Sequence, residues 1–422
     1  MRIHVDKAVS ISKAYFYFAW LFPKVGIALL IFLSACKQQD IAVVENQQEN
    51  PYFQREGVAE VVEAVCDKQV VMLGEGSNHG QGTTQSFKGD LIKALVKTCD
   101  FELVLFEASF YEFVRLNEIQ NANVEVSTED IRAALGYFWG YNLDILDMVN
   151  FLKNAFNSKE VQIGGIDDPI GGPGQNYSNF EMPAQVLPTL PIEESTDCVE
   201  ALEKRILWRF PSDKPYDVVQ KKQLLNCLLP IKDSESLSNS VSWNESMRAS
   251  LHRHIQRDFL SKSDRISGRA ESMYENFEFW LGLSSSIPKT IIWSSSAHAA
   301  KSKKILGDSE TAPNFGAKVK SQFGGAAFSL GFSSLKGAYT DVQGIERPVP
   351  QAVTGSLEKE AFSEYNGDTV FLSTNDLGRL GTRSGWVRGK TVVSQDWSLL
   401  FDGLVVFRQQ EPAIRDRPNP KK

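Results

Sequence analysis

The chain of 422 residues has a hydrophobic fraction of 42% and a formal net charge of −7, which suit one large globular domain, or two, with a substantial core. The excess of acidic side chains argues against a nucleic acid as partner, because proteins that bind nucleic acids carry a basic surface. We find no internal repeat in the sequence.

Residues 1–35 have the features of a lipoprotein signal peptide. Basic side chains precede an apolar stretch at 25–33, and Leu-Ser-Ala-Cys at 33–36 resembles the sequence at which bacterial lipoproteins are cut and lipidated. Cleavage before Cys36 would leave a net charge of −10, three below −7, because the segment carries four basic and one acidic side chain. The alternative, a transmembrane helix, requires about 20 apolar residues, and Pro23-Lys24 interrupts the run.

We therefore expect Cys36 to carry lipid and the protein to lie in the bacterial cell envelope, membrane-anchored, on the periplasmic face or at the outer membrane. Lys37 stands where an aspartate can retain lipoproteins at the inner membrane, which favours the outer membrane. Residues 36–50 are rich in Gln, Asn and Glu, and we predict that they form a solvated tether.

The four remaining cysteines permit disulfides, as is typical of an exported protein. We predict the pairs Cys66–Cys99 and Cys198–Cys227, because each closes a short local loop. Four buried thiols are the alternative. No Cys-x-x-Cys spacing indicates a zinc or redox motif.

The first half of the chain alternates apolar runs with segments of helical periodicity, and the apolar runs return near the end. The expected helices cover 57–66, 85–98, a segment capped by Ser109, 130–137 and 142–156. The expected strands are 69–73, 103–106, 161–166, 290–293, 326–331, 370–373 and 404–407. This alternation predicts an α/β fold with a mostly parallel sheet flanked by helices.

A helical insertion interrupts this pattern at about 175–285. Residues 171–195 are rich in Gly and Pro and are predicted to form a long loop, and the helices 197–210, 217–229, 244–260 and 265–283 follow without strands. We place the domain at 51–412. The polar segment from 408 onward is predicted to be frayed, with a flexible tail at 413–422.

Glu75, Glu107, Asp167 and His298 each follow directly, or within a few residues, on the end of an expected strand. In open α/β sheets, ligands bind outside the carboxyl ends of the strands. We therefore expect these far-separated side chains to meet in one crevice.

His79 follows Glu75 by four residues in a Gly-rich turn. A carboxylate neighbour fixes the tautomer of a histidine and raises its basicity, which suits a general base that acts on water. Glu107 would be a second carboxylate at the same rim, and mutual repulsion should raise the pKa of one of them so that it can act as an acid. The alternative is that Glu75 and His79 only cap the next helix or lie in a loop without a catalytic role.

His252 and His254 lie among charged residues on an expected surface helix, so we assign them to a solvated face. No cofactor is firmly implied, although the imidazole and carboxylate groups could also bind a divalent metal such as Zn or Mn. A nucleophilic serine has weak support: Ser294–Ser296 lie beside His298, but no Gly-x-Ser-x-Gly elbow is present.

Three motifs resemble those of the erythromycin esterase family. They are Leu-Gly-Glu-Gly-Ser-Asn-His-Gly at 73–80, Leu-Phe-Glu-Ala-Ser-Phe at 105–110 and Ile-Trp-Ser-Ser-Ser-Ala-His at 292–298. Supporting stretches are Ala-Leu-Gly-Tyr-Phe-Trp at 134–139, Gly-Ile-Asp at 165–167, Arg269-x-x-x-Met273-x-x-Asn276 and Phe-Asp-Gly-Leu-Val-Val-Phe at 401–407. The resemblance covers about residues 55–412.

The resemblance implies an α/β fold with a helical subdomain and hydrolysis of a small-molecule ester or acyl bond in a deep cleft. Some members of the family open macrolide lactones by direct attack of water. By this resemblance His79 is the general base and Glu75 its partner, while Glu107 and His298 position water or the carbonyl and stabilise the oxyanion. Asp167 and Ser295 would contact substrate.

The sequence departs from the family pattern at two of these motifs. The first motif has one extra residue between Glu75 and His79, and Ser295 stands where the family has an earlier histidine. A metal- or haem-binding lipoprotein without catalysis, an inactive relative and a metal-dependent hydrolase therefore remain alternatives to the esterase-like hydrolase.

Overall fold

The computed structural model describes residues 50–172, 175–187, 192–229, 243–302 and 314–416. The chain divides into two units, Met1–Gln54 and Arg55–Lys422, and the described part of the first holds one 3-10 turn, η1 Pro51–Phe53. The predicted signal peptide, Cys36 and the predicted tether as far as residue 49 lie outside the described residues. None of the helices in the described ranges combines the length and apolarity that a membrane crossing requires.

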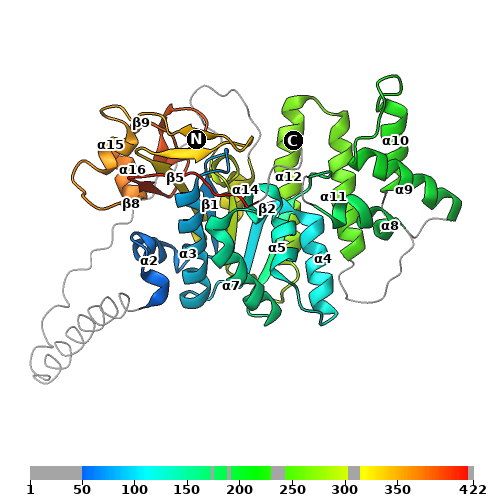
Figure 1. Ribbon diagram of the computed structural model, residues 1–422, viewed down its shortest axis with the longest axis horizontal. Helices are drawn as coiled ribbons and strands as arrows, with labels where there is room; N and C mark the ends of the chain where they lie inside the picture. The colour runs from blue at the N-terminus through cyan, green and yellow to red at the C-terminus, as the bar shows by residue number, and fades with distance from the viewer. Residues whose placement is uncertain (1–49, 173–174, 188–191, 230–242, 303–313, 417–422) are drawn as a thin grey trace, which may run out of the picture. The chain divides into compact units, whose positions relative to one another are not determined.

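A seven-stranded sheet forms the centre of the second unit, in the order β3-β2-β4-β1-β5-β11-β8 (Figure 1). All neighbours are parallel except β11 and β8. The strands are β1 Val70–Glu75, β2 Leu103–Ser109, β3 Gln162–Asp167, β4 Thr290–Ser295, β5 Ala327–Ser334, β8 Thr369–Ser373 and β11 Gly403–Phe407. Each matches a predicted strand, so the mostly parallel α/β fold is confirmed.

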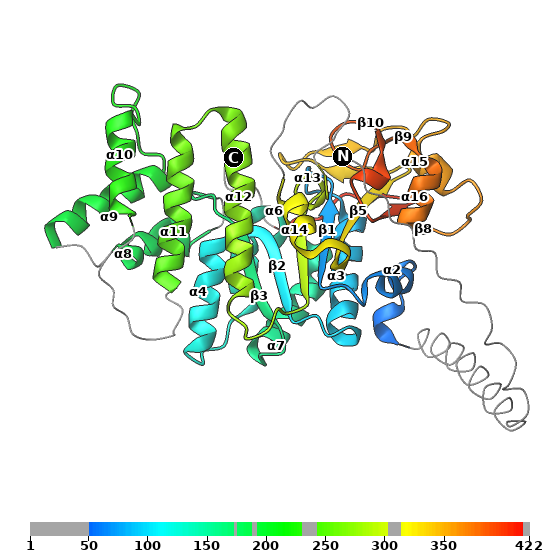
Figure 2. The same cartoon turned by 180° about the vertical axis from the view of Figure 1, so that it is seen from behind.

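The apolar runs form strands here because helices cover both faces of the sheet. Every residue of β1, β2, β4 and β5 is buried, as is typical of parallel strands enclosed on both sides. Helices α3, α5 and α7 lie in front of the sheet in Figure 1, and α12 and α14 lie in front in the reverse view of Figure 2. The helices before β3 are α2 Val58–Val65, α3 Gly82–Thr98, α4 Phe110–Asn121, α5 Thr128–Leu135, α6 Tyr137–Gly140, η2 Leu143–Ile145 and α7 Leu146–Asn157.

The helical insertion follows β3 and ends before β4. Its elements are η3 Tyr177–Glu181, α8 Met182–Val186, α9 Ile192–Ile206, α10 Val218–Cys227, α11 Trp243–Gln256, η4 Arg257–Phe259 and α12 Lys262–Leu281. The prediction of one long loop at 171–195 is wrong, because η3, α8 and the start of α9 fall in this range. Tyr177, Met182 and Val186 are buried in these short helices, so apolar packing there outweighs the local Gly and Pro content.

The C-terminal third adds short elements that the sequence did not predict. They are α13 Ser296–Ala299, α14 Phe315–Phe323, η5 Gly324–Ala326, β6 Ala338–Thr340, β7 Glu346–Pro348, α15 Leu357–Ala361, α16 Thr374–Leu380, β9 Thr382–Gly385, β10 Val393–Asp396 and η6 Trp397–Leu399. The strands β6 and β7 pair with each other, as do β9 and β10. Strands of three or four residues carry too little periodicity to be recognised.

Residues 408–416 of the predicted frayed segment form backbone hydrogen bonds to distant parts of the chain, and the rest of the predicted tail, 417–422, lies outside the described residues. Ala413 N donates to Gly80 O at 2.9 Å, and Asp416 N donates to Tyr141 O at 3.0 Å. These backbone groups find partners in distant loops, which local composition does not reveal.

Both predicted disulfides are present. Cys66–Cys99 links the end of α2 to the end of α3, and Cys198–Cys227 links α9 to α10. The alternative of four free thiols is therefore wrong.

Candidate active site

The four strands β3, β2, β4 and β1 lie side by side in the sheet, and each brings a site residue to its carboxyl end. Asp167, Ser295 and Glu75 are the last residues of β3, β4 and β1, and Glu107 lies near the end of β2. His79 is in the loop after β1, and His298 is in α13, directly after β4. The expected convergence is thus a consequence of the strand order.

Glu75 and His79 form the first cluster. His79 Nδ1 lies 2.9 Å from Glu75 Oε1, and Glu75 is fully buried. The same oxygen accepts a hydrogen bond from Trp139 Nε1 at 2.7 Å. An ionised Glu75 therefore keeps the His79 proton on Nδ1 and leaves Nε2 as the basic nitrogen. Helix α3 begins after Gln81, without a side-chain cap, so Glu75 and His79 do not cap it.

Lys88 is the residue of this cluster that the sequence reasoning missed. It is fully buried in α3, and its Nζ lies 3.0 Å from Glu75 Oε2 and 3.8 Å from the centre of the Trp293 ring. Burial lowers the pKa of Lys88 to about 8 despite the opposing effect of Glu75. Burial alone would raise the pKa of Glu75, but Lys88 and His79 lower it. A lysine on the otherwise apolar stripe of a predicted helix was the available signal.

Glu107 and His298 form the second cluster with Arg269 of α12. His298 Nε2 lies 3.3 Å from Glu107 Oε1, Arg269 Nη2 donates to that oxygen at 3.2 Å, and Ser295 N donates to Glu107 Oε2 at 2.7 Å. Burial opposes ionisation of Glu107, but His298 and Arg269 lower its pKa to about 2. Burial lowers the pKa of His298, and its buried Nδ1 has no hydrogen-bond partner among the residues that the structure describes.

The expectation that one of the two carboxylates has a raised pKa is wrong. Each carboxylate has a cation of its own: Lys88 for Glu75, and Arg269 for Glu107. The attraction to these cations outweighs repulsion between the carboxylates, so both stay ionised.

A cavity of about 220 Å³ joins the two clusters, and His79, Glu107, Asp167 and Arg269 line it. Its remaining lining is largely apolar or aromatic, from Ala108, Ser109, Leu135, Gly136, Tyr137, Phe138, Trp139, Pro169, Gly172 and Gln175. His298 lies behind Glu107, and Ser295 contacts Glu107 through its backbone. The role of Ser295 in substrate binding stays a prediction.

Asp167 binds the guanidinium of Arg269 with both oxygens, at 2.9 Å and 2.5 Å. This holds Arg269 beside Glu107, and the Arg269 side chain lines the cavity and remains 36% exposed. Among the described residues, Arg269 Nη1 has no hydrogen-bond partner, so one N–H edge of a cation is available to a bound molecule.

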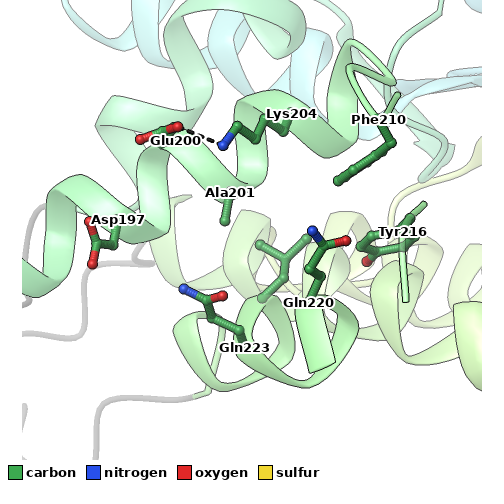
Figure 3. A pocket seen from close by; sticks show the side chains of 9 residues that line it. Asp197, Glu200, Ala201, Lys204, Phe210, Tyr216, Gln220 and Gln223 are labelled. Carbon is green, nitrogen blue, oxygen red and sulfur yellow. Dashed lines mark ion pairs between the residues drawn. The ribbon is translucent and has the colours of Figure 1, made fainter. Parts of the chain in front are cut away.

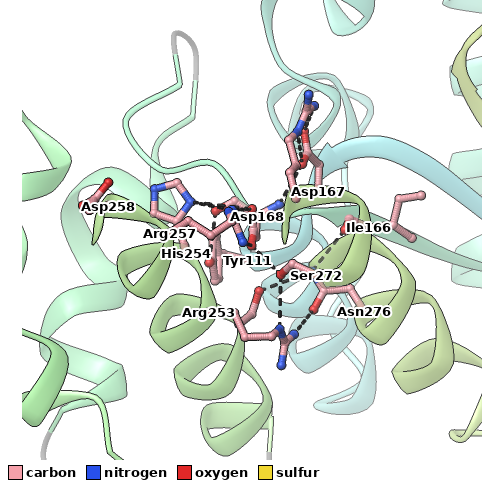
Figure 4. Close-up of polar contacts among 12 residues, drawn as sticks. Tyr111, Ile166, Asp167, Asp168, Arg253, His254, Arg257, Asp258, Ser272 and Asn276 are labelled. Carbon is pink, nitrogen blue, oxygen red and sulfur yellow. Dashed lines mark hydrogen bonds and ion pairs between the residues drawn. The ribbon is translucent and has the colours of Figure 1, made fainter. Parts of the chain in front are cut away.

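The next residue, Asp168, belongs to a separate buried network (Figure 4). Arg257 binds both its oxygens, at 2.8 Å and 2.5 Å, and Ser272 Oγ donates to it at 2.5 Å. Burial opposes ionisation, but His254 and Arg257 hold the pKa of Asp168 well below its usual range. His254 Nδ1 lies 3.6 Å from Asp168 Oδ1, so its assignment to a solvated face is wrong. The sequence did not show that α11 packs against the end of β3.

A second hollow of about 150 Å³ lies between α9 and α10 (Figure 3). Asp197, Glu200, Lys204 and Tyr216 are among its lining residues, and Glu200 pairs with Lys204. None of the predicted site residues lines it. Across the described parts of the chain, no three His, Cys, Asp or Glu side chains are grouped in a way that could hold a metal ion.

Comparison with known proteins agrees with this architecture. The sequence profile of the erythromycin esterase family matches residues 96–408, most of the chain. The chain belongs to the erythromycin esterase family. The matched range contains Glu107, Asp167, Arg269 and His298, whereas Glu75 and His79 precede it.

Solved structures show the same fold as this family member at low sequence identity. A Bacillus cereus protein has a TM-score of 0.64 at 15% identity, covering 85% of this chain and 93% of that chain. A succinoglycan biosynthesis protein has a TM-score of 0.64 at 16% identity, covering 86% and 93%. A mutant of the erythromycin esterase EreC in its open conformation has a TM-score of 0.62 at 15% identity, covering 85% and 94%. No curated protein matches the chain.

Membership in this esterase family supports a hydrolase of ester bonds that acts on a small molecule.

The ion pair between Lys88 and Glu75 in the first cluster predicts a measurable effect on stability. Replacing Lys88 by Met should destabilise the fold by about 3–5 kcal/mol, because the buried charge of Glu75 loses its cation. The double replacement Lys88→Met and Glu75→Gln should cost less than the sum of the single replacements, as measured by urea unfolding.

Strict additivity of the two replacements would contradict a direct ion pair. The exposed pair Glu200–Lys204 in Figure 3 is the control, and its removal should change the free energy of unfolding little.

The lowered pKa of Glu107 predicts a pH dependence of stability. Its ordinary value is 4.5 and its folded value about 2, so its contribution is present above pH 4.5 and is lost as the pH falls toward 2. Between pH 6 and pH 3 this loss should be about 2 kcal/mol. Glu107→Gln lacks this titrating group. Over this interval its free energy of unfolding should therefore fall by that amount less than the free energy of unfolding of the wild type, as followed by denaturant unfolding. The exposed Glu63→Gln should follow the wild type, and parallel curves for Glu107→Gln and the wild type would refute the assignment.

Proposed function

We propose that this protein hydrolyses an ester, lactone or related acyl bond with water that His79 activates. The observation that carries the proposal is the Glu75–His79 contact beside a cavity that also presents Glu107 and Arg269. A base with a fixed tautomer next to a cationic N–H edge is the pairing that direct attack of water on a carbonyl requires.

In this mechanism His79 Nε2 removes a proton from water as the water oxygen attacks the acyl carbon. Arg269, which lines the cavity, stabilises the negative charge that develops on the carbonyl oxygen. The C–O bond to the leaving group then breaks, and the proton on His79 passes to the alcohol oxygen. The acid product then loses its proton to solvent. Because water and not a side chain attacks the acyl carbon, no covalent enzyme intermediate forms.

The surrounding charges support these roles. Glu75 holds the Nδ1 proton of His79 and stabilises the imidazolium that forms after proton transfer. Glu107 and Asp167 stay beside Arg269 and keep its guanidinium oriented. The aromatic wall at 137–139 suits the apolar part of a small acyl substrate.

We test this proposal with a panel of model esters and lactones. His79→Ala should lower kcat by about 10²–10⁴-fold, because a positioned general base contributes that much. His252→Ala is the control: it removes a histidine in α11 that does not line the cavity, and it should retain the wild-type rate. Unchanged turnover in His79→Ala would remove His79 from the mechanism, and a stoichiometric metal or tetrapyrrole in a protein without turnover would favour a binding role instead.

We also propose that the protein is an envelope lipoprotein whose Cys36 carries the lipid, on the periplasmic face or at the outer membrane. The support is the motif at 33–36 and the Gln- and Asn-rich segment that follows it. Cys36→Ser should abolish incorporation of labelled palmitate and move the protein from the membrane fraction to the soluble fraction. Labelling of the serine variant at the wild-type level would exclude this site.

A further inference from the structure

The segment 409–416, which we call the C-terminal strap, lies beyond the residues that the family profile matches. It binds the loop after His79 through two backbone hydrogen bonds: Ala413 N to Gly80 O at 2.9 Å, and Gly82 N to Glu411 O at 2.8 Å. It also binds the chain just after Trp139, where Leu143 N donates to Ile414 O at 2.8 Å. The strap therefore connects the two segments that supply His79 and Trp139.

Arg415 of the strap contacts His79 directly. Its Nη2 donates to His79 O at 3.1 Å, and its Nη1 donates to Asp341 O at 3.3 Å. The guanidinium carbon lies 5.1 Å from the ring centre of Tyr137 and 5.7 Å from that of Phe138. One side chain thus touches the backbone of the proposed base and two aromatic residues of the cavity wall.

His79 needs such support because its backbone is strained. Its φ of 52° lies in the left-handed region, which costs a residue with a Cβ about 1–2 kcal/mol. Such conformations persist only where the surroundings determine them. The carbonyl of His79 accepts hydrogen bonds from Arg415 and from Gln85 Nε2 at 3.0 Å.

The backbone of Gly80, the next residue, is also held in place by its neighbours. A Cβ on Gly80 would lie 1.6 Å from Thr340 O, so the two chains pass each other too closely for any side chain. Gly80 O accepts from Thr340 N at 2.9 Å and from Ala413 N at 2.9 Å. The strap supplies one of the two donors to Gly80 O and one of the two donors to His79 O.

We infer that Arg415 is a positioning residue for His79, and that the C-terminal strap sets the orientation of the His79 imidazole toward Glu75 and the cavity. The catalytic consequence rests on the proposed function. The orientation itself does not, because it can be measured without any substrate.

The experiment compares Arg415→Ala with Arg408→Ala in the full chain. Arg408 is a matched control: it donates to Gly367 O and Tyr365 O and lies over the ring of Phe362, contacts of the same kinds away from the site. Arg415→Ala should lower kcat for model ester hydrolysis by about 10–100-fold, because a displacement of about 1 Å can cost 10²-fold. KM should change by less than about 3-fold, since the residue does not line the cavity. Arg408→Ala should leave both constants near wild type, and Arg415→Lys should restore part of kcat.

The second readout is the ¹⁵N NMR spectrum of the histidine imidazoles, with the His79 signals assigned from His79→Ala. These signals should shift in Arg415→Ala and not in Arg408→Ala, whether or not any ester is hydrolysed. If no ester is turned over but the shift occurs, the proposed function fails and the positioning role stands. His79 signals and kcat that are equal in the two arginine variants would overturn the inference. If Arg415→Ala does not fold, Arg415→Lys provides the same comparison, because one ammonium group cannot reproduce the planar fork.

Discussion

The buried carboxylate of Glu75 is the constraint on which the rest of the site depends. An ionised carboxylate without exposure to water is costly unless it is paired and hydrogen-bonded. Lys88 supplies the charge, and Trp139 and His79 supply further hydrogen bonds. Because these partners come from α3, α6 and the loop after β1, the ionised state of Glu75 requires three separate segments to be in place. The proton position on His79 follows from that same arrangement.

Each of the three carboxylates Glu75, Glu107 and Asp167 at the sheet edge is paired with a cation from a helix. Lys88 of α3 serves Glu75, and Arg269 of α12 serves both Glu107 and Asp167. Parallel strands place several carboxylates close together, which alone would raise some of their pKa values. The cations on the helices counteract this repulsion, so the carboxylates stay ionised. Burial lowers the pKa of the neighbouring His298.

The sheet was predictable strand by strand because each strand is a continuous apolar run, and the site residues were predictable because they lie at the ends of those runs. The pairings were not predictable in the same way. Lys88 is a single charge on an apolar stripe, and nothing local to the sequence shows that it faces Glu75. Arg415 lies in a polar, Pro-containing segment whose composition favours disorder, and its placement follows from hydrogen bonds to distant residues, among them His79 and Asp341. Local patterns thus located the anions and bases, whereas the cations that control them depend on tertiary contacts.

Asp167 and Asp168 show how the helical insertion becomes part of the active site. Adjacent residues at a strand end point to opposite sides, so the end of β3 presents one carboxylate to the cavity and the other to the interior of the insertion. Asp167 orients Arg269 toward Glu107, while Asp168 binds Arg257, and both arginines belong to the insertion. A shift of η4 and α12 relative to β3 would break the Asp168–Arg257 pair and would move Arg269 at the same time. Two consecutive residues at the end of β3, Asp167 and Asp168, therefore couple the insertion to the cationic edge of the cavity. Loss of the insertion would also remove Arg269, which faces the substrate carbonyl in the proposed mechanism.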